Sequence, residues 1–267
     1  MNEIGFIGCG NMGGAIARAV CAAADPSRVF LANRTAAKAE ALAIRLRCHT
    51  ASNEAVFAGC ELIFLGVKPQ MMPDVLAAAA PVLAARTDRF VLVTMAAGLT
   101  MARIRALAGG EYPVIRIMPN TPAAIGEGMI QYCADGVTDA ELREFCGLLR
   151  PAGRLDELPE PLIDAASCVS GCGPAFAYQF IEALADGGVA CGLPRAKAME
   201  YAAQMLAGSA QMVLQTGQHP GTLKDAVCSP GGSTIQGVRT LEQRAFRGAV
   251  TDAVIAAYEK TKELGKA

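Results

Sequence analysis

The sequence has no excess of either charge and no long apolar run. Its formal net charge is −1 at pH 7, so electrostatics gives no reason to expect nucleic acid or an anionic membrane surface as a partner. The most apolar segments, such as residues 71–85, contain an aspartate and two prolines and are shorter than the roughly 20 apolar residues that span a bilayer. With 52% hydrophobic residues the chain can bury a substantial core. We therefore expect a soluble globular protein.

The sequence also lacks the residue clusters that build metal sites and disulfide frameworks. Its two histidines, His49 and His219, are far apart and accompany no carboxylate or cysteine at metal-ligand spacing, which argues against a metal site and against a nucleophilic triad. The ten cysteines are scattered without a CxxC pair and follow no basic and apolar signal segment. We expect free thiols in a reducing cytoplasm.

Short apolar segments alternate with alanine-rich stretches in the first part of the chain. Such alternation predicts βαβ units, in which helices cover both faces of a parallel sheet. The strand-like segments are Glu3–Gly8, Val29–Asn33, Leu62–Val67, Phe90–Met95 and Val114–Met118. After about Glu160 only long helical stretches follow, at residues 161–192, 194–216 and 246–266.

The expected fold is therefore α/β, with two domains. We expect a Rossmann-type dinucleotide-binding domain with a mostly parallel sheet over residues 1–158, followed by an all-helical domain over residues 159–267. The boundary is expected within residues 154–161, where two prolines and several charges interrupt the periodic pattern.

A glycine-rich motif follows the first expected strand. Gly8, Gly10 and Gly13 have the G-x-G-x-x-G spacing and lie between that strand and a helix. Glycines at these positions let backbone N–H groups approach a pyrophosphate at the N-terminus of the helix. The alternative is a tight turn that packs helix against strand. The position of the motif in a strand–helix context favours dinucleotide binding.

The end of the second expected strand carries no acidic residue. An NAD-binding domain has an Asp or Glu there to bind the ribose 2′-hydroxyl, whereas this chain has Asn33, Arg34 and Thr35. A carboxylate would repel a 2′-phosphate, and a guanidinium pairs with one. We predict a preference for NADPH, with NADH as the second cofactor. The alternative is that Asn33 caps the next helix and Arg34 is simply solvated; Lys38 fits either interpretation.

Further segments mark the same edge of the expected sheet. Lys68 and Pro69 follow one strand, and residues 95–99 and 118–122 end the next two with small residues or prolines. Ligands of open α/β sheets bind outside the carboxyl ends of the strands, so these segments indicate a cleft there. Lys68 is expected either near the cofactor or in solvent.

Three helix-weakening residues interrupt the first long helical stretch. Gly171, Gly173 and Pro174 are expected to weaken or kink it. Hydroxyacid dehydrogenases of related architecture carry a Lys four residues after the last glycine of a similar segment and an Asn four beyond that, where this chain has Ala177 and Ile181. Without an acid or base for a carbinol substrate, alcohol oxidation is disfavoured.

A second glycine-rich segment, VCSPGGSTIQGV, spans residues 227–238. Pro230, Gly231 and Gly232 stand directly before Ser233 and Thr234, and no histidine or carboxylate in the segment could activate the two hydroxyls. One interpretation is a helix cap followed by a packing turn. The other is a helix start whose free N–H groups and hydroxyls receive an anion.

The segment SPGGSTIQGVRTLE, residues 229–242, together with the N-terminal glycine motif, resembles the signature of pyrroline-5-carboxylate reductases. VKP, MPNTP, SGCGPAF and HPGTLKD occur in the order seen in that family, so the resemblance covers essentially the whole chain. It implies reduction of 1-pyrroline-5-carboxylate to L-proline by hydride transfer from NAD(P)H, the last step of proline biosynthesis. It also implies a homo-oligomer, at least a dimer, that pairs through the C-terminal helical domain.

Two alternatives stay open beside this function. One is the reduction of another cyclic imine or ketimine carboxylate, because backbone N–H groups recognise a carboxylate without measuring ring size. The other is a non-enzymatic sensor that binds a nucleotide in its first domain and assembles through its second.

The resemblance also implies roles for individual residues. Gly231, Gly232, Ser233 and Thr234 should contact the substrate; of these, Thr234 should bond the imine nitrogen and Ser233 the carboxylate, as the catalytic pair. The expected cofactor contacts are Ile7, Gly8, Cys9, Gly10, Asn11, Met12, Gly13, Asn33, Arg34, Asn53, Gly66, Val67, Lys68, Pro69, Met95, Ala96 and Ala97. Ala226 departs from the family, whose members often carry an asparagine near the cofactor at that position.

Overall fold

The computed structural model describes residues 3–264 and divides into two compact units. Gly173–Ala256 forms the second unit, and the described residues before and after it form the first. The chain therefore leaves the first unit after Cys172 and returns to it at Ala257. The second unit is an insertion between the last two helical segments of the first.

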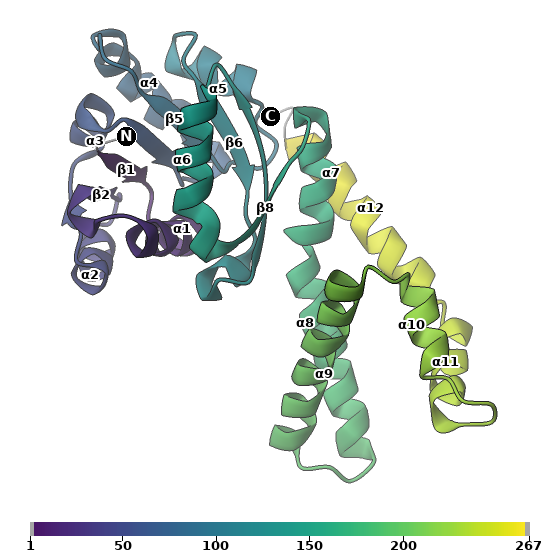
Figure 1. Ribbon diagram of the computed structural model, residues 1–267. Coiled ribbons are helices and arrows are strands. Elements are labelled where there is room, and N and C mark those ends of the chain that lie inside the picture. Colours follow the sequence, from purple (N-terminus) through teal and green to yellow (C-terminus); the bar gives the residue numbers. More distant parts are fainter. Residues whose placement is uncertain (1–2, 265–267) are drawn as a thin grey trace. The chain divides into compact units, whose positions relative to one another are not determined.

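The first unit is built around a β-sheet with helices packed against it (Figure 1). The sheet has eight strands in the order β3-β2-β1-β4-β5-β6-β7-β8. Neighbouring strands are parallel except β6 and β7, which are antiparallel. This confirms the expected Rossmann-type, mostly parallel sheet. The strands are β1 (Ile4–Ile7), β2 (Val29–Ala32), β3 (His49–Thr50), β4 (Leu62–Leu65), β5 (Val91–Thr94), β6 (Val114–Met118), β7 (Gly128–Asp135) and β8 (Gly153–Glu157).

Three of these strands have no counterpart among the segments expected from the sequence. β3 has only two residues, and β7 carries the buried but polar Gln131. β8 is the charged segment GRLDE at the end of the strand order, with no buried residue. It lies in the region where a domain boundary was expected, and the compact units divide later, after the helix that follows it.

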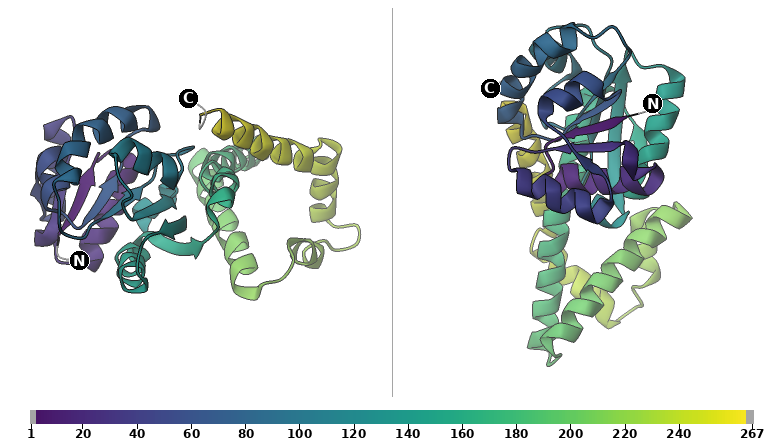
Figure 2. Two further views of the ribbon diagram at one scale, coloured as in Figure 1. Left: turned by 90° about the horizontal axis from the view of Figure 1, so that it is seen from above. Right: turned by 90° about the vertical axis from the view of Figure 1, so that its left-hand side faces the viewer.

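Helices cover both faces of the sheet, as expected (Figure 2). One face packs against α1 (Asn11–Ala23), α2 (Ala36–Leu46) and α6 (Asp139–Leu149). The other packs against α3 (Asn53–Gly59), α4 (Met72–Ala84), α5 (Met101–Ala108) and α7 (Glu160–Ser170). The four-residue strands β1, β4 and β5 are completely buried between these layers.

The strand order places a ligand crevice at the ends of β1 and β4. β1 pairs with β2 on one side and with β4 on the other. After β1 the chain adds β2 and β3 on one side, and from β4 onward it adds strands on the other side. The carboxyl ends of strands at such a switch point are where ligands of open α/β sheets bind. The glycine-rich motif begins at the end of β1.

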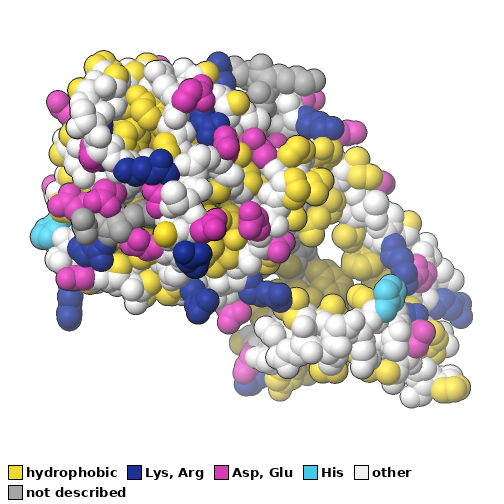
Figure 3. All heavy atoms as spheres, turned by 45° about the horizontal axis from the view of Figure 1, so that its top comes forward, with side chains coloured by type: hydrophobic (Ala, Val, Ile, Leu, Met, Phe, Trp, Pro, Cys, Tyr) yellow, Lys and Arg dark blue, Asp and Glu magenta, His cyan; other side chains and the backbone are white. Residues whose placement is uncertain are grey.

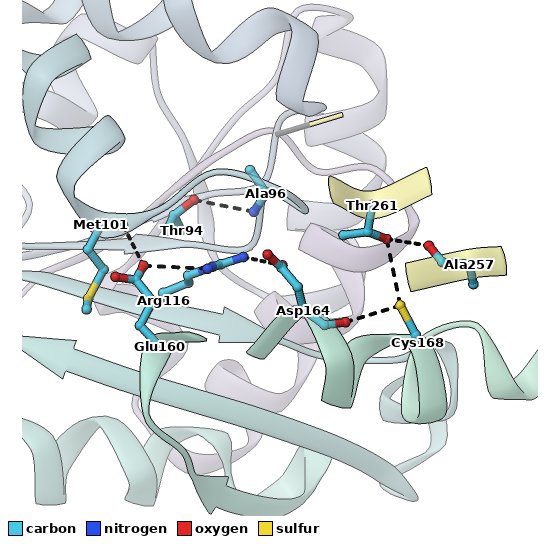
Figure 4. Close-up of polar contacts among 9 residues, drawn as sticks. All are labelled: Thr94, Ala96, Met101, Arg116, Glu160, Asp164, Cys168, Ala257 and Thr261. Atoms are coloured by element: carbon cyan, nitrogen blue, oxygen red, sulfur yellow. Dashed lines mark hydrogen bonds and ion pairs between the residues drawn. The ribbon is translucent and has the colours of Figure 1, made fainter. Parts of the chain in front are cut away.

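A buried arginine ties α7 to the sheet (Figure 4). Arg116 in β6 is 1% exposed, and its guanidinium lies 2.5 Å from a carboxylate oxygen of Asp164 and 3.5 Å from one of Glu160. Both acidic residues belong to α7, and Glu160 also accepts a hydrogen bond from the N–H of Met101 at the start of α5. We call Arg116, Glu160 and Asp164 the Arg116 cluster. It fixes α7 against β6 and α5 through charge as well as through apolar packing.

The second unit is helical throughout, as expected. Its helices are α8 (Gly173–Ala190), α9 (Arg195–Thr216), α10 (Pro220–Ala226), α11 (Ser233–Gln243) and most of α12 (Phe246–Leu264). The predicted weakening at residues 171–174 is a break, because α7 ends at Ser170 and α8 begins at Gly173. In the part of the chain described, no helix has the length and hydropathy needed to cross a membrane.

The second unit buries few of its own side chains. Among its described residues, the hydrophobic side chains that are fully buried are those of Ala185, Ala198 and Ala202. Large hydrophobic residues such as Tyr201 and Met205 are instead exposed, and hydrophobic side chains also reach the surface that Figure 3 draws. The second unit therefore leaves its large hydrophobic side chains exposed instead of packing them in a core of its own.

Candidate cofactor and substrate sites

Three glycines bring the motif after β1 and the turn after β4 into direct contact. Gly8 has a φ of +97°, and a Cβ there would lie 2.8 Å from the carbonyl carbon of Gly66. A Cβ on Gly66 would lie 2.5 Å from the carbonyl oxygen of Gly8, which a Cβ on Gly13 would also meet. Side chains at these positions would force the two turns apart. Gly10, by contrast, has open space around it, so a ligand can approach its backbone.

The side chain of Asn33 holds the glycine-rich motif to the end of β2. Its amide oxygen accepts a 3.0 Å hydrogen bond from the N–H of Cys9, and its amide nitrogen donates to the carbonyl oxygen of Thr35 at 3.0 Å. The N-cap of α2 is Thr35. The alternative in which Asn33 caps this helix is therefore wrong, because the Asn33 side chain is bonded to the motif instead.

A cleft of about 310 Å³ opens at the ends of β1, β2 and β4. It gathers nine of the residues expected to contact the cofactor: Ile7, Gly8, Gly10, Asn33, Arg34, Asn53, Gly66, Val67 and Lys68. We call it the cofactor cleft. Cys9, Asn11, Met12, Gly13, Pro69 and Met95–Ala97 do not line it. Of these, Ala96 is 1% exposed, and its N–H donates to the hydroxyl of Thr94, so it has almost no free surface to offer a cofactor.

Four residues of the cofactor cleft were not among the expected contacts. Lys38 lies one helical turn after Arg34, and Thr35 stands between them. Met71 and Val75 enter the cleft from the start of α4. Lys38 lies in the first turn of α2, whose N-cap is Thr35, so its nearness to Arg34 in the sequence already points to it. Apolar residues such as Met71 give no comparable signal in the sequence.

The cofactor cleft is positively charged. Arg34, Lys38 and Lys68 are exposed, and their side chains form no ion pair or hydrogen bond with the part of the chain that the structure describes. No acidic residue lines the cleft. Cys9 adds no negative charge, because burial, and secondarily the nearby Cys48, raise the pKa of its thiol to about 12. The cleft can therefore accept an anionic ligand.

The expected substrate residues lie in the second unit, at the start of α11. Gly231 has a φ of +71°, Gly232 is the N-cap, and the helix begins at Ser233. The hydroxyls of Ser233 and Thr234 are not used in capping, and within residues 3–264 neither has a hydrogen-bond partner. Both residues are exposed. The start of α11 thus offers two hydroxyls and first-turn N–H groups to a ligand, whereas the capping interpretation has no hydrogen bond to support it.

Ala226, the histidines and the cysteines do not form a further ligand site in the described residues. Ala226 is exposed at the end of α10. His219 caps α10 by accepting a hydrogen bond from the N–H of Gly221 at 3.1 Å. Across the described residues, no three His, Cys, Asp or Glu side chains come together as a metal ion would require. All ten cysteines fall within the described residues and are free thiols.

Two family models match the chain, one in its N-terminal part and one in its C-terminal part. The model described as "Pyrroline-5-carboxylate reductase dimerisation" matches residues 160–264. The model described as "NADP oxidoreductase coenzyme F420-dependent" matches residues 3–98. The second match covers the glycine-rich motif and β1 to β5, and the first covers α7 to α12. A dimerisation domain supports assembly of the chain into a homo-oligomer.

Relatives of known name match over the whole length. The chain is 40% identical to the pyrroline-5-carboxylate reductase of Escherichia coli K12, over 99% of this chain and 98% of that one. It is 39% identical to the enzyme of Glycine max, over 98% and 95% of the two chains. A crystal structure of the Plasmodium falciparum pyrroline carboxylate reductase with NADP bound superimposes with a TM-score of 0.87 at 32% identity, covering 98% of each chain. The chain belongs to the pyrroline-5-carboxylate reductase family.

Proposed function

We propose that the protein reduces 1-pyrroline-5-carboxylate to L-proline with NADPH, the last step of proline biosynthesis. The observation that carries the proposal is the full-length match to enzymes of that name, at about 40% identity, in a chain whose cofactor cleft is open and cationic. The proposed location is a reducing cytoplasm, where cysteines remain thiols.

The cofactor cleft fits a dinucleotide phosphate. The contact among Gly8, Gly13 and Gly66 leaves the backbone at Gly10 open, so its N–H groups receive the pyrophosphate at the start of α1. Arg34 pairs with the 2′-phosphate, and Lys38 reinforces that charge from the next turn. When bound, NADPH supplies the hydride. The protein's own contribution is to hold the cofactor and the imine carbon in reacting contact.

The start of α11 fits the substrate. Its carboxylate is held by the Ser233 hydroxyl and the first-turn N–H groups, without an arginine. Thr234 donates a hydrogen bond to the imine nitrogen, because an imine carbon accepts hydride readily once its nitrogen is protonated or hydrogen-bonded. No carboxylate occupies the first turn of α11 to compete for these groups.

The direct test follows NADPH oxidation by absorbance, with and without 1-pyrroline-5-carboxylate. The proposed enzyme oxidises NADPH only when the cyclic imine is present, and proline appears in equal amount. A sensor binds NADPH and oxidises none. A six-membered cyclic imine carboxylate, offered in parallel, distinguishes the alternative substrate by its kcat/KM, and a higher value for that compound would replace the proposed substrate.

We predict that Arg34→Glu raises the KM for NADPH at least about tenfold more than the KM for NADH, since it exchanges a charge-assisted bond for a repulsion. Steady-state kinetics with each cofactor measures this split. The control is Arg103→Glu on α5, an exposed arginine of the same unit that does not line the cleft, which should leave both KM values unchanged. Equal increases for the two cofactors would reject Arg34 as the discriminating residue.

We also propose that the second unit pairs with the same unit of another subunit. Its fully buried hydrophobic side chains are alanines, whereas an apolar groove of about 430 Å³ between α8, α11 and α12 is lined by residues such as Phe180, Leu241 and Val250. Leu241 is 43% and Val250 41% exposed, which is a large apolar surface for a lone chain.

Sedimentation should therefore give a mass of at least two chains at micromolar concentration. Val250→Asp should shift the protein towards monomer, because it places a charge in the groove. Ile44→Asp on α2 is the matched control, since Ile44 is 79% exposed in the first unit. A folded, active monomer of the unaltered chain would remove this proposal.

A further inference from the structure

A second cavity in the first unit lies outside the cofactor cleft. It occupies about 510 Å³ between α1 and α2, which pack side by side on one face of the sheet. We call it the α1–α2 groove. Only Gly10 and Lys38 line both this groove and the cofactor cleft. Its volume is within the range of small-molecule sites, and the proposed reduction uses neither Arg18 nor Arg45, which line it.

Three cations converge on the α1–α2 groove. Arg18 comes from α1, and Lys38 and Arg45 come from α2, two turns apart. No acidic side chain lines the groove. None of the three side chains forms an ion pair or hydrogen bond with the described part of the chain. Like charges that face one cavity repel one another, so an anion bound there relieves the repulsion.

Two other arginines of the same unit, Arg86 and Arg89, do have partners. The guanidinium of Arg86 is bonded to Asp88 and to two carbonyl oxygens. Arg89 makes a two-bond contact with Glu141 at 2.7 and 2.8 Å. Unlike Arg86 and Arg89, the three cations of the α1–α2 groove have no partner among the described residues and can all turn to a ligand in one cavity.

The rest of the groove is apolar or backbone. Ala15 and Leu42 are 6% and 4% exposed and form part of its floor, and Gly14 leaves the two helices close without a side chain between them. At one end, Gly10 and Asn11 present the first-turn N–H groups of α1. A cationic rim over an apolar floor suits a ligand with several phosphate groups and a flat organic part.

We propose that the α1–α2 groove is a second nucleotide site, which binds a free nucleoside triphosphate beside the cofactor cleft. Arg18 and Arg45 pair with the phosphate groups, and the base lies on the apolar floor. Because Lys38 and Gly10 serve both cavities, a nucleotide in the groove opposes the binding of NADPH, and the opposition is reciprocal. This last point rests on the proposed cofactor, whereas the site itself does not.

The test is calorimetric titration of the cofactor-free protein with ATP in the absence of divalent cations, so that its outcome does not depend on any catalytic activity. ATP should bind, and the double variant Arg18→Gln/Arg45→Gln should weaken it at least about tenfold, the effect of losing one charge-assisted bond. Arg34→Gln should weaken NADPH binding and leave ATP binding unchanged. Arg103→Gln should change neither.

Three outcomes would overturn the proposal. The first is no binding of ATP at millimolar concentration. The second is loss of ATP binding in Arg34→Gln with no loss in the double variant, because ATP would then simply occupy the cofactor cleft. The third is equal affinity for ATP and tripolyphosphate, since the apolar floor would then contribute nothing. Circular dichroism of each variant checks that the fold is retained.

Discussion

Replacing Thr234 with alanine is expected to lower kcat by about 10- to 1000-fold, the range between losing a hydrogen bond and losing a general acid. The affinity for NADPH should change little, because Thr234 lies in the second unit and does not line the cofactor cleft. The Thr234 hydroxyl has no partner in the described chain, so it is available to the substrate. The expected loss of activity is large because no histidine or carboxylate nearby in the sequence can replace this hydroxyl as the proton donor.

Two further variants make this expectation specific. Thr234→Ser restores a hydroxyl and should recover much of the activity. Thr240→Ala removes a hydroxyl from the same helix, where it donates to the carbonyl oxygen of Gln236 at 3.0 Å, and should leave kcat near the wild-type value. If Thr234→Ala kept the wild-type kcat and raised only the KM for the imine, Thr234 would serve uniform binding instead of imine activation.

The second large effect is expected at Arg116. Replacing it with methionine should lower the free energy of unfolding by about 3 kcal/mol, because Glu160 and Asp164 would lose their buried cationic partner. The two carboxylates are 24% and 26% exposed and keep part of their hydration, so the loss should fall at the lower end of the range for broken buried pairs. Urea unfolding followed by circular dichroism measures it.

A surface pair provides the comparison. Lys197 and Glu200 lie 2.9 Å apart on α9, with side chains 58% and 63% exposed, and Lys197→Met should cost less than about 1 kcal/mol. Replacing Asp164 with asparagine in the Arg116→Met background should recover part of the lost stability, because an unpaired charge is removed. If Arg116→Met were no more destabilising than Lys197→Met, the Arg116 cluster would not anchor α7.

The core of the sheet could be predicted from the sequence because its strands are short apolar segments bounded by turns. Val114–Met118 was predicted as a strand on this basis, although Arg116 stands at its centre. The partners of Arg116 could not be predicted, since Asp164 is 48 residues away in the chain and nothing local links the two. β8 was not predicted as a strand because, unlike the core strands, it is not apolar. Its charged residues are typical of a loop, and as a strand at the end of the sheet it has little to bury.

In the candidate site, too, local features could be predicted from the sequence, whereas contacts between distant residues could not. The spacing of Gly8, Gly10 and Gly13 predicted a turn between a strand and a helix, and the motif does lie between β1 and α1. The positive φ of Gly8 and the close approach of Gly13 to its carbonyl oxygen require glycine there. The structure adds that Gly66, 58 residues further along, is held to the same packing by its contact with Gly8. One interpretation assigned the Asn33 side chain to a helix cap, since sequence neighbours suggest local bonds. Its amide nitrogen does have a local partner in Thr35, but its amide oxygen accepts from the N–H of Cys9, 24 residues away.

The position of the second unit within the chain has a consequence for synthesis on the ribosome. α7 contacts the end of α12 through the thiol of Cys168 and the hydroxyl of Thr261, which lie 93 residues apart. All of Gly173–Ala256 is made between these two segments, which takes on the order of 10 s at ordinary translation rates. During that time the nascent first unit carries α7 without the segment that packs on it. The sheet domain begins to form first and is completed last, by residues that emerge after the whole helical unit.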